Sequence, residues 1–109
     1  MPTLDLINLK EFSDELISQI LTIYLADGKK DIEELNKAVE DNNFSEAGKK
    51  AHKITGSSKT VGALNVAELT EQLENTLENN PHEFSNQQLI ELSKAFSDVE
   101  THIKKHNLI

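Results

Sequence analysis

The residue of this sequence most suited to chemistry is His52, because of the residues that flank it. Gly48 stands four positions before the histidine, Gly56 four positions after it, and Lys59 seven positions after it. In a helix of about 100° per residue, all three lie within about 40° of the histidine and share its side. A glycine inside a helix costs roughly 1 kcal/mol relative to alanine, so two of them around one residue indicate close approach by another molecule.

An imidazole in such surroundings is suited to nucleophilic attack on phosphorus. It offers an unprotonated ring nitrogen at neutral pH, and a phosphoryl acceptor must present that nitrogen in line with the bond being broken. The apolar residues of the same segment lie about 150° away around the helix, so the histidine is predicted to face solvent. We therefore expect His52 to be an exposed phosphoryl acceptor, with Gly48 and Gly56 leaving room for the donor.

Lysines gather around this histidine in an otherwise acidic chain. Between residues 45 and 62, four lysines stand against one glutamate, a local charge of +3, whereas the rest of the chain totals −11. The four are Lys49, Lys50, Lys53 and Lys59. Ammonium groups there could steer an acidic partner and neutralise charge on a transferring group, and Lys53 and Lys59 are the candidates for this role.

The histidine has to be carried by a helix, and helical periodicity runs through nearly the whole chain. Ser13 is a suitable cap for a first helix of about residues 13–42. Gly28 lies within the apolar stripe of this helix without shifting it, so we expect no break there and expect the glycine to let a neighbouring helix approach closely. The apolar stripe of this helix consists of Ile17, Leu21, Tyr24, Ile32, Leu35 and Val39. A second, shorter stripe is predicted to be covered by apolar residues of the N-terminal segment. The stripe consists of Leu16, Ile20 and Ile23, and the covering residues are Leu4, Leu6, Ile7 and Leu9.

The helix that carries His52 comes next. A turn at residues 41–43 precedes it, Ser45 is predicted to cap it, and it continues to about Thr60 before Gly62 ends it. Its inward face consists of Ala47, Ala51, Ile54, Ser58 and Val61.

Capping patterns mark the two remaining helices. Asn65 and Glu68 form a capping-box pattern that opens a third helix, which residues 79–81 close. Ser85 and Gln88 form the same pattern at the start of a fourth helix.

With the last helix ending near Lys105, the chain contains four amphipathic helices joined by short connections. This pattern predicts an all-α fold, an antiparallel four-helix bundle with an N-terminal covering segment or short helix. A chain of 109 residues suits one core, so residues 1–109 are expected to form a single domain.

Composition limits the compartment and the partners. The net charge of −8 disfavours nucleic acid and anionic membranes, and the charged residues among the first twenty positions interrupt any signal peptide or membrane span. The sequence has no cysteine, which favours a cytoplasmic protein. His102 and His106 have the spacing of metal ligands on a helix, but no further ligand completes a site, so neither a metal nor a cofactor is expected.

The segment from Ala51 to Ala63 is similar to the signature of the histidine-phosphotransfer (HPt) domain family. In that signature an Ala-His pair is followed by a hydrophobic residue, a lysine, a glycine, small residues and a closing Gly-Ala. The long acidic helix before this segment and the two helices after it also resemble the family, so the likeness covers nearly the whole chain. One position departs from the pattern, because Thr55 stands where the family usually has a lysine, and Lys53 and Lys59 are the residues that could substitute for it.

This resemblance implies a phosphorelay intermediate. Nε2 of His52 would accept a phosphoryl group from a receiver-domain aspartate and pass it to an aspartate of another response regulator. The partners implied are receiver domains of response regulators, which bind Mg²⁺ on their own side, and a hybrid sensor histidine kinase. The chain would be a monomeric phosphocarrier without catalytic activity of its own, and Thr55 is grouped with the residues that face the partner.

Two other interpretations remain open. His52 followed by Thr55 loosely resembles the phosphoacceptor and dimerisation helix of a histidine kinase, although the sequence lacks the proline and ATP-binding domain typical of that class. A helical adaptor that binds a partner without chemistry is the other possibility, and it would leave the two glycines unexplained. Labelling by ATP alone would indicate the kinase fragment, and the absence of acid-labile phosphate on His52 would indicate the adaptor.

Overall fold

A computed structural model describes residues 3–109, and every regular element in that range is helical. The four α-helices are α1 (Asp14–Glu40), α2 (Phe44–Val61), α3 (Leu64–Asn79) and α4 (Asn86–Lys105). Two short 3-10 helices, η1 (Leu6–Leu9) and η2 (Pro81–Glu83), precede α1 and α4 respectively. None of the helices in the described range has an apolar stretch of the length and hydropathy that crossing a membrane requires.

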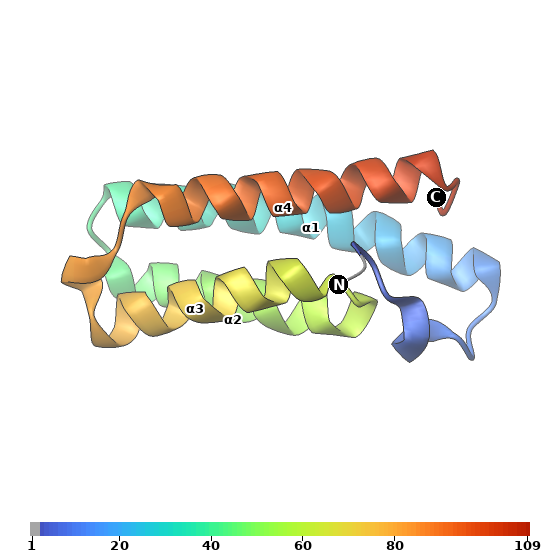
Figure 1. Cartoon of the computed structure of the whole chain (residues 1–109), viewed down its shortest axis with the longest axis horizontal. Helices are drawn as coiled ribbons and strands as arrows, with labels where there is room; N and C mark the ends of the chain where they lie inside the picture. The colour runs from blue at the N-terminus through green and yellow to red at the C-terminus, as the bar shows by residue number, and fades with distance from the viewer. Residues whose placement is uncertain (1–2) are drawn as a thin grey trace.

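The helices run alternately up and down, so that each is antiparallel to the next along the chain (Figure 1). In that view α4 lies in front of α1 and α3 in front of α2, and the N-terminal segment and the C-terminus lie toward the same end. The described residues measure 44 × 23 × 21 Å, and the 27 residues of α1, about 40 Å at 1.5 Å per residue, run almost the full length. The antiparallel four-helix bundle predicted from the sequence is therefore confirmed.

The core is built from one stripe of each helix, as the periodicity predicts. The stripe of α1 is buried at Leu21, Tyr24, Ile32 and Leu35 and partly buried at Ile17 and Val39. The other helices contribute the almost fully buried residues Ile54, Ser58, Val66, Leu73, Leu92, Val99 and Ile103. The phase continues through Gly28, so α1 is one unbroken helix.

Gly28 lies where α1 meets α4, and the closeness of this contact requires the glycine. A Cβ atom added at Gly28 would lie 2.6 Å from Cζ of Phe96. The Phe96 ring is itself buried and packs against Tyr24, with the ring centroids 5.7 Å apart. An added methyl group would therefore have to displace a ring that is buried and already packed against Tyr24.

Gly28→Ala is expected to lower the free energy of unfolding by about 1–3 kcal/mol, because the overpacked ring has to shift. Urea denaturation measures this change. Gly56→Ala is the matched control, since no atom lies within 4 Å of a Cβ added there, and alanine should stabilise that helix by roughly 1 kcal/mol. If both variants gained stability, the close α1–α4 contact would be contradicted.

The predicted caps are correct at α1 and α4. Ser13 caps α1, and its hydroxyl oxygen accepts a hydrogen bond from the N–H of Leu16 at 3.2 Å. At the start of α4, Ser85 and Gln88 form the predicted capping box, in which Oε1 of Gln88 accepts from the N–H of Ser85 at 3.3 Å.

The predicted caps are wrong at α2 and α3. Asn43, rather than Ser45, caps α2, because its side-chain oxygen accepts from the N–H of Glu46 at 3.2 Å. Only two residues separate α2 from α3, and α3 starts without a side-chain cap. Gly62 adopts a φ of 82°, a left-handed conformation that ends α2 so abruptly that Asn65 already lies inside the next helix.

The N-terminal segment is fastened to the C-terminal end of α2. The N–H of Asp5 donates to the carbonyl oxygen of Gly62 at 2.9 Å, and the side-chain amide of Asn8 donates to the carbonyl oxygen of Lys59 at 3.2 Å. These bonds fix where η1 can lie, and they direct it to α2.

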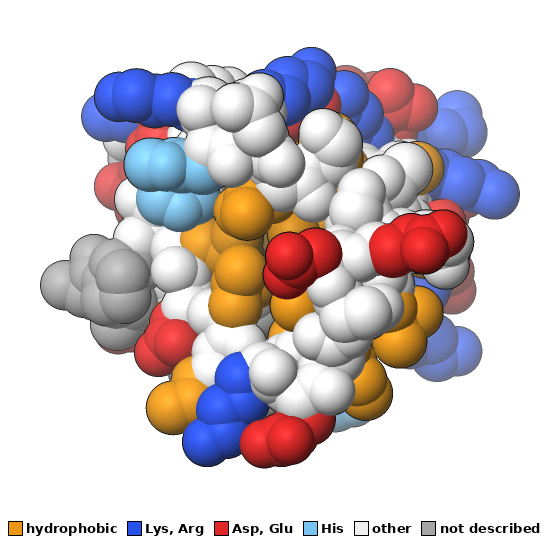
Figure 2. All heavy atoms as spheres, turned by 90° about the vertical axis from the view of Figure 1, so that its right-hand side faces the viewer, with side chains coloured by type: hydrophobic (Ala, Val, Ile, Leu, Met, Phe, Trp, Pro, Cys, Tyr) orange, Lys and Arg blue, Asp and Glu red, His pale blue; other side chains and the backbone are white. Residues whose placement is uncertain are grey.

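The second apolar stripe of α1 is for this reason left largely uncovered. Leu4 and Leu9 of the N-terminal segment are buried, but Leu16 is 40% exposed and Ile23 is 60% exposed. The predicted cover is therefore wrong for these two residues. Figure 2 shows hydrophobic side chains reaching the surface at the end of the bundle where the N-terminal segment and the C-terminus lie.

Candidate functional site

His52 projects from the middle of α2 into solvent, as the helix phase predicts. Its side chain is 78% exposed, whereas Ala51 and Ile54 beside it are buried in the core. The helix itself is held in place from α1, because the hydroxyl of Tyr24 lies 2.7 Å from Oγ of Ser58 in the buried interface. Burial raises the pKa of Tyr24 to about 12, so the phenol is neutral and available for this hydrogen bond.

The orientation of the imidazole is set by Glu74 on α3. Nδ1 of His52 lies 3.2 Å from Oε1 and 3.1 Å from Oε2 of this carboxylate, which is only 19% exposed. A carboxylate can only accept, so Nδ1 carries the proton and donates it, and Nε2 is left with a free lone pair. The two ring nitrogens lie on opposite sides of the Cβ–Cγ axis, so Nε2 faces away from α3.

Glu74 was not among the residues singled out from the sequence. The signal that could have found it is a row of acidic residues at helical spacing on α3, formed by Glu71, Glu74 and Glu78. Which member of such a row meets the histidine depends on how α3 is set lengthwise against α2, and only the packed bundle defines that.

The two glycines that flank His52 differ in their surroundings. Gly56 is exposed, and a Cβ added there would have nothing within 4 Å. Gly48 is buried, and its Cβ would lie 3.5 Å from the side chain of Glu78. The open floor predicted on both sides of the histidine therefore exists only on the Gly56 side.

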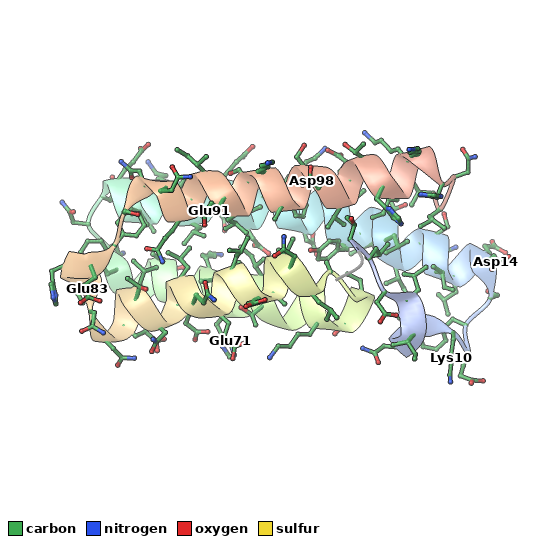
Figure 3. All side chains as sticks on the ribbon, viewed as in Figure 1. Lys10, Asp14, Glu71, Glu83, Glu91 and Asp98 are labelled. Atoms are coloured by element: carbon green, nitrogen blue, oxygen red, sulfur yellow. The ribbon has the colours of Figure 1, made fainter. Side chains whose placement is uncertain are left out.

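Three of the four lysines on α2 are paired with carboxylates of the neighbouring helices. The pairs are Lys50 with Glu34 and Lys53 with Asp31 on α1, and Lys59 with Glu71 on α3. Figure 3 labels Glu71 on α3, the carboxylate that lies 3.5 Å from Nζ of Lys59. The hydrogen bond between Lys50 and Glu34 raises the pKa of the lysine and lowers the pKa of the carboxyl. The positive patch predicted from the sequence is thus largely neutralised, including at Lys53 and Lys59.

Thr55 lies inside the bundle and not beside the histidine at the surface. The residue is 6% exposed, and its Oγ1 lies 2.9 Å from the carbonyl oxygen of Ala51 and 2.7 Å from Oγ1 of Thr70 on α3. Its grouping with the partner-facing residues is therefore not supported. A small hydroxyl residue fits this buried position, because its polar atom is hydrogen-bonded inside the α2–α3 interface.

An apolar groove of about 270 Å³ runs between α1 and α2 on the side of the histidine away from α3. Ile20, Ile23 and Val61 supply its apolar lining, and Ser57 and Thr60 of α2 form its edge next to Gly56. The side chain of Ile23, which is 60% exposed, lines this groove from α1.

Two further histidines lie at the C-terminal end of α4, where His102 belongs to the last turn and His106 is the C-cap. The rings of His102 and His106 have centroids 4.3 Å apart, and partial burial with the neighbouring positive charges lowers the pKa of His102. Among residues 3–109, no group of three or more His, Cys, Asp or Glu side chains is arranged to hold a metal ion.

A four-helix bundle that presents one fixed histidine to solvent defines a class of helical carrier domain. The family model of the Hpt domain matches residues 19–102, from the first turns of α1 to the last turns of α4, and the chain belongs to this family. Hpt domains are phosphocarriers that act in histidine phosphotransfer within phosphorelays, where they interact with receiver domains and kinases. Comparisons with curated protein sequences and with solved structures found no match.

Proposed function

We propose that this protein is a phosphorelay intermediate in which Nε2 of His52 accepts a phosphoryl group from a receiver-domain aspartate and delivers it to another. The observation that carries the proposal is the pairing of Nδ1 with Glu74, because it leaves Nε2 unprotonated, exposed and turned toward solvent. Gly56 keeps the approach to that nitrogen free of side chains.

The transfer exchanges one bond to phosphorus for another. The O–P bond of the aspartyl phosphate breaks as the N–P bond to Nε2 forms, and the aspartate leaves as a carboxylate. The imidazole ring gains positive charge in this step, and the carboxylate of Glu74 at Nδ1 stabilises it while the proton stays on Nδ1. Running the same step backward loads the next aspartate, and Mg²⁺ belongs to the receiver's side of the complex.

Residues 1–109 act in this proposal as one phosphotransfer unit in the cytoplasm. The chain is a monomeric carrier that needs neither metal nor cofactor of its own, and a hybrid sensor histidine kinase supplies the first phosphoryl group. The alternatives have no supporting observation. A bare adaptor has no use for a histidine oriented by a partly buried carboxylate.

Incubation with phosphorylated receiver domains tests the proposal. The expected result is acid-labile, base-stable phosphate on this chain, lost again when an unphosphorylated receiver is added. Labelling by ATP alone, without a receiver, would instead indicate a kinase fragment, and no labelling at all would indicate an adaptor.

Glu74→Ala is expected to slow transfer about tenfold, because the ring loses both its orientation and the charge that balances it. The free imidazole should then also populate the tautomer with the proton on Nε2, which cannot attack phosphorus. ¹⁵N NMR of the histidine ring reports the tautomer directly, alongside single-turnover transfer rates.

Glu78→Ala is the control for this variant, since Glu78 lies one turn further along α3 and covers Gly48 without a hydrogen bond to the ring. Glu74→Gln should retain the Nδ1–H tautomer through its carbonyl oxygen and give an intermediate rate. An unchanged tautomer in Glu74→Ala would show that the carboxylate does not orient His52.

A further inference from the structure

Of the four lysines on α2, Lys49 alone has no ion pair and no side-chain hydrogen bond within residues 3–109. It is exposed, and it lies one turn before His52. We propose that the ammonium group of Lys49 contacts the oxygens of the transferring phosphoryl group. This inference rests on the proposed function and identifies which cation serves that site.

Lys53 is paired with a buried carboxylate and is not free to contact a phosphoryl group. It lies 3.1 Å from Oδ1 of Asp31, a residue of α1 that is only 3% exposed. No other side chain of the described range lies within hydrogen-bond or ion-pair distance of that carboxylate. Moving Lys53 to a phosphoryl group would leave a buried charge uncompensated, which is strongly unfavourable. Lys53 therefore joins α1 to α2.

Lys59 lies on the wrong side of the ring. The residues of α2 on this side reach α3, as Thr55 does through Thr70 and Lys59 does through Glu71. Nδ1 of His52 faces the same side through its bond to Glu74, so the phosphoryl group on Nε2 lies on the opposite side. Lys59 thus faces the nitrogen that does not react.

Lys49 lies on the reactive side. It is displaced from His52 by about 60° around the helix in the direction of α1, the direction in which Lys50 and Lys53 reach Glu34 and Asp31. Residues three apart on a helix have Cβ atoms about 5–6 Å apart, so a flexible four-methylene stem spans the distance to a group on Nε2.

In the transfer step Lys49 keeps all of its protons. Its three N–H groups donate hydrogen bonds to the phosphoryl oxygens while the O–P bond to the partner's aspartate breaks and the N–P bond to Nε2 forms. The ammonium offsets the repulsion between the phosphoryl oxygens and the Glu74 carboxylate at Nδ1 on the other side of the ring.

Single-turnover transfer from a phosphorylated receiver domain tests the role of Lys49. Lys49→Ala is expected to slow the reaction about tenfold, and Lys49→Arg is expected to recover most of the rate because it restores the charge. Lys59→Ala is the matched control, because Lys59 is another exposed lysine on the same helix, and this variant should transfer at the wild-type rate. The assignment would be overturned if Lys59→Ala slowed transfer and Lys49→Ala transferred at the wild-type rate.

A second measurement needs no receiver. His52 is phosphorylated with phosphoramidate, a small phosphoryl donor, and the lysine ammonium resonances are followed by ¹⁵N NMR. The Nζ signal of Lys49 is expected to shift on phosphorylation, and those of Lys53 and Lys59 to stay in place. A shift at Lys59 instead of Lys49 would refute the inference. If phosphoramidate labels His52 and shifts Lys49 but no receiver exchanges phosphate with the chain, the proposed function fails while the contact stands.

Discussion

His52→Gln is expected to abolish phosphoryl acceptance and leave the bundle intact. Glutamine removes the nucleophilic nitrogen, and the described chain offers no second one beside Glu74. The fold should not respond, because the side chain of His52 is exposed and its hydrogen bond to Glu74 lies at the surface of α2. Stability should stay within about 0.5 kcal/mol of wild type, as for other exposed substitutions. Acid-labile label after incubation with a phosphorylated receiver measures the loss, and circular dichroism checks the fold.

His106→Gln provides the control, since this exposed histidine on the end of α4 is remote from α2. The His106→Gln variant should acquire as much acid-labile phosphate as the wild-type protein. Acid-labile phosphate on His52→Gln would mean that another residue is the acceptor, and the proposed function would have to be moved to that residue.

Gly56→Gln is expected to separate stability from function. No atom lies within 4 Å of the added Cβ, so glutamine enters without a clash and should stabilise α2 by up to about 1 kcal/mol. Its side chain leans toward the N-terminal end of the helix and thus over the approach to His52. Transfer from a receiver should fall about 100-fold, or by about 2.7 kcal/mol in activation free energy.

A small phosphoryl donor distinguishes steric obstruction of the receiver from a loss of reactivity at His52. Phosphoramidate should label Gly56→Gln at nearly the wild-type rate, because it needs little space, whereas Gly56→Ala should show a smaller loss with the receiver. Wild-type transfer by Gly56→Gln would place the partner's approach elsewhere on the molecule.

The sequence was sufficient for the helices and for the exposure of His52, because both follow from periodicity. The apolar stripe of each helix has to face the core. On α2 this stripe lies opposite His52, so the histidine has to face water. Gly28 was interpretable for the same reason, since a break there would have shifted the stripe. The Asn43 cap was missed because Asn43 and Ser45 are both competent caps, and the turn geometry decides between them.

Side-chain partners across helices were beyond the sequence. The pairing of Glu74 with His52 and of Asp31 with Lys53 depends on the lengthwise register of α3 and α1 against α2. Local charge counting treated the lysines as free because their partners are distant in the chain. Thr55 was misplaced by the same cause, since the resemblance compares positions and not the packing around them.

The two unlike sides of His52 have a kinetic consequence. The α3 side carries the Glu74 carboxylate, so in the proposed relay a receiver approaches from the Gly56 side, and a typical interface covers about 800 Å² on each partner. Donor and acceptor must therefore compete for the same face, and a ternary complex is sterically barred. The proposed relay then follows a ping-pong scheme, in which the discharged donor leaves before the next receiver binds. An excess of unphosphorylated receiver would slow loading simply by occupying that face, which makes throughput depend on the ratio of the two partners.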